Sequence, residues 1–129
     1  MRVYETVLYA SDVAAAAAFY SDVLGLRAIA APDEHSAAFR VDARSVLLLF
    51  DPGRSSGSGR FVPAHGAQGP GHVAFAVDGD ELAQRVGRLQ ADGVAIEREI
   101  TWPLGGHSIY VRDPAGNSVE LIAGEAWEA

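Results

Sequence analysis

The chain of 129 residues, 49% hydrophobic and 21% charged, is long enough for one compact domain with its own core, or for two small intertwined units. It has no cysteine and all ten of its basic residues are arginine, which excludes disulfides, thiolate metal sites, cysteine nucleophiles and lysine Schiff bases. The net charge of -7 argues against a nucleic-acid partner, and no stretch resembles a signal peptide or a membrane span, so we expect a cytoplasmic protein.

The first half of the chain predicts one strand, one helix and three further strands. Residues 3–9 are expected to form the first strand. A helix over residues 12–24 follows, with Ser11 as its N-cap and Gly25 directly after its end. The three short strands are expected over residues 28–31, 37–41 and 45–50.

Residues 53–71 separate the two halves and contain six glycines and two prolines. This composition is typical of a mobile linker rather than of a buried element. A loop of this length in a compact chain is usually either functional or disordered. It includes His65, for which an ordinary loop position and a role in a lid both stay open.

The second half repeats the order of the first. A strand over 72–77 and a helix over 79–91 are followed by strands over 94–102, 108–112 and 118–122. We therefore predict an α+β protein of two βαβββ modules that arose by internal duplication. The modules cover residues 1–52 and 72–123, and residues 124–129 form a tail.

The duplication brings residues that can bind a metal ion into equivalent positions. Glu5 and His72 each open the first strand of a module, whereas Glu120 in the last strand is opposite Leu47. Strand alternation directs His72 to the face away from the helix. A glutamate such as Glu120 among apolar strand residues is costly unless it is paired or binds a cation. One imidazole and two carboxylates suit a divalent ion such as Mn, Fe, Ni or Zn.

Three motifs carry a family resemblance: LYASDVAAAAAFYSDVLGL at 8–26, GPGHVAFAV at 69–77 and YVRDPAGNSVEL at 110–121. The chain resembles the vicinal oxygen chelate superfamily, which includes glyoxalase I, bleomycin-resistance proteins, fosfomycin-resistance enzymes and extradiol dioxygenases. The resemblance implies that the two modules form a U-shaped mixed sheet around a cup that holds a metal ion. The positions that match the family's ligands are Glu5, His72 and Glu120.

The sequence departs from each branch of that family. Glyoxalase I has a further glutamate at the position that Leu47 holds, and extradiol dioxygenases typically have histidine in place of Glu5. Fosfomycin-resistance enzymes commonly use a lysine, which this chain lacks. We therefore predict a metal-dependent enzyme that binds a small substrate through two neighbouring oxygens, and leave isomerase, lyase, transferase and dioxygenase chemistry open.

Other residues have predicted roles in such a site. Glu120 or Tyr110 is the candidate for proton transfer. Tyr9 shares a strand face with Glu5, and Trp102 either lines the cup or fills an edge of the core. Arg112 either clamps an anion or is an ordinary surface residue.

The alternative function is that of a drug- or metabolite-binding protein of the bleomycin-resistance kind, without turnover. In that case the aromatic residues Tyr9, Trp102 and Tyr110 matter more than the acids. The short chain and its linker also predict a homodimer in which Glu5 of one chain joins His72 and Glu120 of the other.

Overall fold

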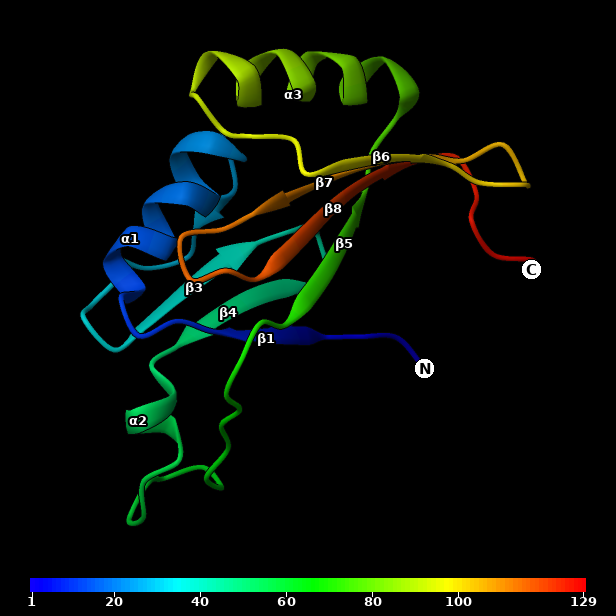
Figure 1. The fold of residues 1–129 in the computed structure, drawn as a ribbon. Coiled ribbons are helices and arrows are strands. Elements are labelled where there is room, and N and C mark those ends of the chain that lie inside the picture. Colours follow the sequence, from blue (N-terminus) through cyan, green and yellow to red (C-terminus); the bar gives the residue numbers. More distant parts are fainter. The chain divides into compact units, whose positions relative to one another are not determined.

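In the computed structural model, which describes all residues from Met1 to Ala129, the chain divides into two compact units. Unit 1 comprises Met1–Gly71 with Pro114–Gly116, and unit 2 comprises His72–Asp113 with Asn117–Ala129. Each unit contains a four-stranded mixed sheet with a helix against one face (Figure 1). The predicted α+β fold of two βαβββ modules is thereby confirmed.

Unit 1 has the sheet order β1-β4-β3-β2, in which β1 runs parallel to β4 and the other pairs are antiparallel. Its elements in chain order are β1 (Glu5–Tyr9), α1 (Val13–Ala18), the π-helical turn η1 (Phe19–Val23), β2 (Arg27–Ala28), β3 (Ser36–Arg40), β4 (Val46–Phe50) and α2 (Pro52–Ser55).

The first helix differs from the prediction at both ends. Its N-cap is Asp12, not Ser11, because the Asp12 side chain accepts a hydrogen bond from the Ala15 backbone N–H at 3.1 Å. The α-helix ends at Ala18 and continues as η1. Since a π-turn holds more residues per turn, successive side chains point in more similar directions, and the adjacent rings of Phe19 and Tyr20 are both buried.

Unit 2 repeats this architecture with the sheet order β5-β8-β7-β6, and β5 runs parallel to β8. Its elements are β5 (His72–Ala76), α3 (Gly79–Ala91), β6 (Arg98–Thr101), β7 (His107–Arg112) and β8 (Ser118–Ala123). The strand β6 is shorter than the predicted 94–102. The Val94 N–H donates to the Leu89 carbonyl at the end of α3. Because this bond ties Val94 to the helix, the strand begins only after it.

The segment between the modules contains structure that its composition does not predict. The side chain of Asp51 caps α2 by accepting a hydrogen bond from the Gly53 N–H at 2.9 Å. The backbone N–H of His65 donates to the Ser55 carbonyl at 3.0 Å, and Ser55 is buried. The segment thus holds one buried residue, Ser55, and a backbone hydrogen bond ties His65 to it.

The register of the two sheets shows that the predicted counterpart of Glu120 in unit 1 is wrong by one residue. Glu5 pairs with Val46 in unit 1, and His72 pairs with Ser118 in unit 2. Glu120 lies two residues after Ser118, so its counterpart is Leu48 and not Leu47. A shift of one residue moves a side chain to the opposite face of a sheet, and Leu47 is in fact fully buried on the helix side.

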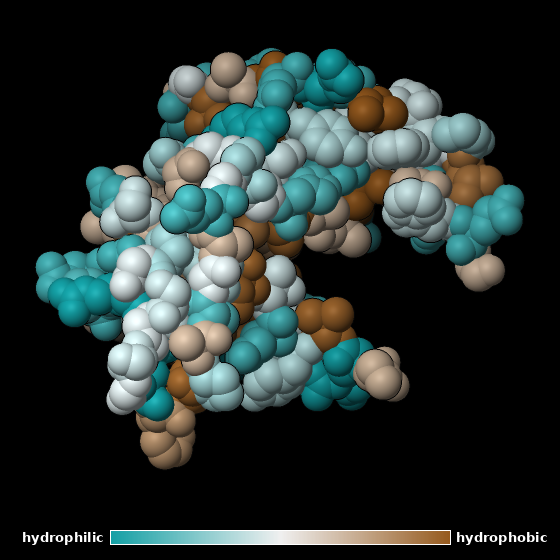
Figure 2. Space-filling model, turned by 60° about the horizontal axis from the view of Figure 1, so that its bottom comes forward, coloured by the Kyte–Doolittle hydropathy of each residue, from teal (hydrophilic) through white to brown (hydrophobic).

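No helix is long and apolar enough to cross a membrane. On the face drawn in Figure 2, hydrophobic residues are interspersed with hydrophilic ones. The large hydrophobic side chains that are exposed include Phe61 and Trp127, which lie far apart in the sequence.

Candidate functional site

Unit 2 gathers its candidate site residues on the face of the sheet that is turned away from α3. Three strands position them: β5 carries His72, β7 carries Ser108 and Tyr110, and β8 carries Glu120. In the register, Glu120 lies between Ala74 of β5 and Tyr110 of β7. The alternate residues of these strands, among them Ile109 and Leu121, point to the helix side and are buried.

The imidazole of His72 and the carboxylate of Glu120 face each other, each with an atom that can accept a hydrogen bond. His72 Nε2 is 3.3 Å from Glu120 Oε2, and His72 Nδ1 is 3.1 Å from the backbone carbonyl oxygen of Ser118. Because a carbonyl oxygen can only accept, Nδ1 carries a hydrogen and donates it. In the neutral ring Nε2 then has a lone pair aimed at a carboxylate oxygen, and two acceptors at this distance attract a proton or a cation between them.

A chain of hydrogen bonds holds the other oxygen of Glu120. The indole Nε1 of Trp102 is 2.7 Å from Ser108 Oγ, which in turn is 2.5 Å from Glu120 Oε1. An indole N–H can only donate, so the hydroxyl proton of Ser108 is directed to Oε1. This leaves Oε2 as the oxygen that faces His72, and Glu120 is only 7% exposed.

Sequence reasoning missed Ser108 and the hydrogen bond that it accepts from Trp102. Ser108 is fully buried, and the indole of Trp102 reaches Glu120 only through its hydroxyl. The available signal was strand alternation, because Ser108 lies two residues before Tyr110 and therefore shares its face.

Tyr110 lies beside this pair. Its ring stacks on that of His72, with centroids 6.2 Å apart and planes inclined by 20°. Burial, and then a hydrogen bond with the Glu120 carboxylate, raise the pKa of the Tyr110 phenol. The phenol thus stays protonated at neutral pH and is able to donate a hydrogen bond.

Arg112 shares the face of Tyr110 but is engaged elsewhere. Its guanidinium binds the Glu97 carboxylate through two hydrogen bonds, from Nε at 2.6 Å and from Nη2 at 3.1 Å. These bonds lower the pKa of Glu97. An anion clamp at Arg112 would therefore have to compete with a carboxylate that is already bound.

Unit 1 holds the remaining predicted residues. Glu5 is exposed at the start of β1 and shares its face with Tyr9, as alternation predicts. The Tyr9 hydroxyl lies 2.7 Å from Nδ1 of His65, whose ring packs edge to face on Phe50. The segment between the modules thus places His65 on the helix-free face of the unit 1 sheet.

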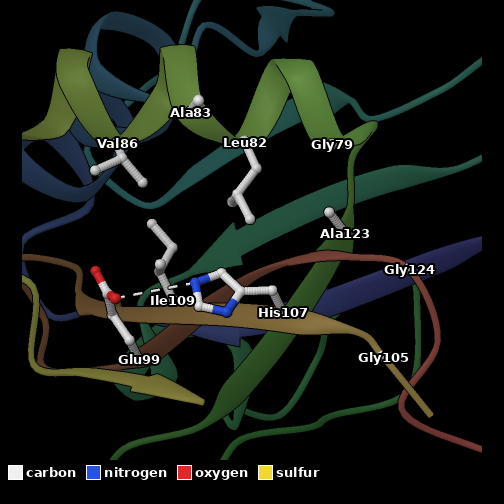
Figure 3. A pocket seen from close by; sticks show the side chains of 10 residues that line it. All are labelled: Gly79, Leu82, Ala83, Val86, Glu99, Gly105, His107, Ile109, Ala123 and Gly124. Atoms are coloured by element: carbon white, nitrogen blue, oxygen red, sulfur yellow. Dashed lines mark ion pairs between the residues drawn. The ribbon is translucent and has the colours of Figure 1, made fainter. Parts of the chain in front are cut away.

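A pocket in unit 2 lies on the helix side of the sheet (Figure 3). This pocket of about 610 Å³ is lined by Leu82 and Val86 of α3 and by Ile109 of β7, with His107 and Glu99 beneath them. His107 is the first residue of β7, and its Nε2 is 3.9 Å from Glu99 Oε2. Both side chains are about half exposed, so this pocket lacks the buried carboxylate of the helix-free face.

Family comparison now identifies the fold. The model of the Glyoxalase/Bleomycin resistance protein/Dioxygenase superfamily matches residues 2–121. The chain belongs to this superfamily. The crystal structure of lactoylglutathione lyase from Agrobacterium tumefaciens is 41% identical, with a TM-score of 0.90 over 99% of this chain and 97% of that one. No curated protein matches the chain.

More distant superfamily structures share the fold alone. A glyoxalase/bleomycin resistance protein/dioxygenase from Nocardioides is 23% identical, with a TM-score of 0.73 over 96% of this chain and 83% of that one. A glyoxalase/dioxygenase from Nostoc punctiforme is 22% identical, with a TM-score of 0.72 over 96% and 91%. The family model that matches residues 2–121 confirms the resemblance that the three sequence motifs indicate.

Members of the superfamily typically use a divalent metal ion, and the donors of unit 2 fit one. The pair offers an imidazole nitrogen and a carboxylate oxygen, and a hydrogen bond to the second nitrogen or oxygen of each fixes its orientation. No group of three such side chains is found in the chain.

Proposed function

We propose that the protein is a metal-dependent enzyme of the glyoxalase type, with a divalent ion held by His72, Glu120 and Glu5. The observation that carries the proposal is the 3.3 Å approach of His72 Nε2 to Glu120 Oε2, two acceptors whose orientations are fixed by other bonds. The substrate is a small molecule that binds through two neighbouring oxygens. The similarity to a lactoylglutathione lyase supports lyase chemistry as the first activity to assay.

The protein's own residues have distinct tasks in this proposal. The ion, when bound, acts as a Lewis acid toward the substrate oxygens. When substrate binds, the Tyr110 phenol, which keeps its proton at neutral pH, turns its hydrogen bond from Glu120 to a substrate oxygen. Glu120 takes or returns the substrate proton through Oε2, while Ser108 and Trp102 position the carboxylate.

Metal content of the dialysed full-length protein tests the proposal. We expect about one transition-metal ion per chain by elemental mass spectrometry, and its loss in His72→Ala and in Glu120→Gln. The control is His35→Ala, which removes a histidine from the loop before β3 and should keep the metal. If the wild type takes up none of Mn, Fe, Ni or Zn on titration, the alternative of a drug- or metabolite-binding protein is favoured, and ligand binding in the presence of a chelator would then support it.

The third ligand is proposed to come from a second copy of the chain, as superfamily members are commonly dimeric. In a homodimer with shared sites, Glu5 of one chain completes the pair of the other. Neither Glu5→Gln nor His72→Ala would be active alone. In the mixed dimer, however, one of the two sites is intact and the other carries both substitutions.

Subunit exchange between these two variants therefore separates the arrangements. Random pairing of equal amounts should restore about a quarter of the wild-type sites, measured as bound metal or as activity. A site built within one chain gives no recovery, and a monomeric mass by light scattering at micromolar concentration would also contradict the dimer.

A further inference from the structure

One row of side chains crosses the whole sheet of unit 1. The register places Glu5 beside Val46, Val46 beside Arg40, and Arg40 beside Arg27. Residues in register point to the same face. That face is the helix-free one, because Phe39 and Leu47, which alternate with this row, are fully buried on the helix side.

The two arginines at the end of the row are directly opposite each other on neighbouring strands. Like charges in this arrangement destabilise a sheet. Neither Arg27 nor Arg40 makes an ion pair, although the chain has 17 acidic residues for its ten arginines. The missing partner is thus not explained by a shortage of carboxylates.

Unit 2 shows how the same position is completed. There the corresponding row runs from His72 through Ser118 to Arg112, so Arg112 is the counterpart of Arg40. Glu97 from the neighbouring segment binds Arg112 through two hydrogen bonds. In unit 1 the residue opposite Arg40 is Arg27, whereas the register of unit 2 places Ile96, next to Glu97, opposite Arg112. No carboxylate forms an ion pair with Arg27 or Arg40, so both guanidinium groups lack an anion.

We infer that Arg27 and Arg40 bind an anionic group of the substrate, a carboxylate or a phosphate. Guanidinium groups suit both anions because their N–H donors match two oxygens at once. The inference rests on the proposed function in taking Glu5 as one edge of the reaction site. Two strand spacings separate Glu5 from Arg40, which sets the anionic group on the order of 10 Å from the reacting oxygens.

Calorimetric titration of the metal-free full-length protein with inorganic phosphate, and separately with malonate, tests this inference. We expect the wild type to bind at least one of them, and the tighter one identifies the anionic group of the substrate. Arg27→Gln and Arg40→Gln should each weaken that binding at least tenfold. The control Arg88→Gln removes the same charge from α3 and should change binding less than twofold.

The melting temperature at low ionic strength is a second measurement. A substitution of an arginine that is not repelled by a neighbour would leave it unchanged. Loss of either arginine relieves the repulsion, so the melting temperature of Arg40→Gln should rise by about 1–3 °C without added anion. The preferred anion should then stabilise the wild type more than the variant.

The outcomes separate this inference from the proposed function. Wild-type protein that takes up metal but binds neither anion overturns the inference alone. Equal binding by the wild type and both arginine variants overturns it as well. Anion binding that needs both arginines, in a protein that takes up no metal, supports the anion site and contradicts the metal centre.

Discussion

The two modules share one topology but differ in how far their polar groups are satisfied. On the helix-free face of unit 2, Ser108 binds Glu120, and Glu97 binds Arg112. On the same face of unit 1, Glu5 and Arg40 make no ion pair. The repeated topology places residues at equivalent positions in the two sheets. The side chains next to each position then decide whether its polar group is already bonded within the protein or is free to bind a ligand.

The largest effect is expected from placing a glutamate at Leu47 or at Leu48, the two candidates for the counterpart of Glu120. Leu47→Glu puts a carboxylate into the fully buried helix side and should lower the free energy of unfolding by about 3–5 kcal/mol. Leu48→Glu puts the same side chain on the face of Glu5, where it is the counterpart of Glu120, and should fold. Denaturant unfolding of both variants compares the two costs.

Metal affinity sharpens the same comparison. If the fourth equivalent position borders the metal centre, Leu48→Glu adds a carboxylate ligand and should bind Mn²⁺ more tightly than the wild type, by about tenfold. Tighter binding in Leu47→Glu, or an equal loss of stability in both variants, would contradict the register that equates Leu48 with Glu120.

Most strands and helices of both modules could be predicted from the sequence, because each is indicated by its own local pattern of apolar and turn residues. The helix Gly79–Ala91 has the predicted bounds, and the apolar alternation of β5 directs His72 away from it. What failed was register. Val46, Leu47, Leu48 and Leu49 are all apolar, so the pattern of β4 does not reveal which residues face the helix, and the aligned serines at 45 and 118 gave the wrong offset.

The candidate site was predictable as a set of residue types but not as a network. Glu5, His72 and Glu120 are suggested by position in the repeat and by the cost of burying a carboxylate. The bond from Trp102 to Ser108 spans the turn between β6 and β7, and its direction follows only from the geometry of that turn. The pairing of Tyr9 with His65 joins residues 56 positions apart, which no local pattern specifies.

An intermediate effect is expected from removing one hydrogen bond of the unit 2 network. Trp102→Phe keeps an aromatic ring but loses the N–H that directs the Ser108 hydroxyl to Glu120. Outer hydrogen bonds of this kind typically change metal affinity 10–100-fold, and we expect a loss of about tenfold here. The matched control is Trp127→Phe, whose indole is 81% exposed in the C-terminal tail.

Calorimetric titration with Mn²⁺ measures both variants, and Ser108→Ala should weaken binding at least as much as Trp102→Phe. Equal affinities of Trp102→Phe and Trp127→Phe would show that the indole only fills space at the edge of the sheet. In that event the satisfied groups of unit 2 would reduce to Ser108 with Glu120 and Arg112 with Glu97.

The smallest effect concerns the alkaline limb of stability. The pKa of Tyr110 is raised in the folded protein, mainly by burial, so the folded state holds its phenolic proton more tightly than the unfolded chain. That contribution is fully present below the unfolded pKa of about 10 and is lost as the pH rises through the folded pKa. Since the chain has no lysine and no cysteine, tyrosines are the side chains that titrate in this range.

Denaturant unfolding between pH 9 and pH 11 measures this effect. The free energy of unfolding should decline less steeply with pH for Tyr110→Phe than for the wild type, whereas the substitution Tyr4→Phe, at an exposed tyrosine, should leave that decline unchanged. Parallel curves for all three proteins would contradict the raised pKa of Tyr110 and hence its hydrogen bond with the buried Glu120.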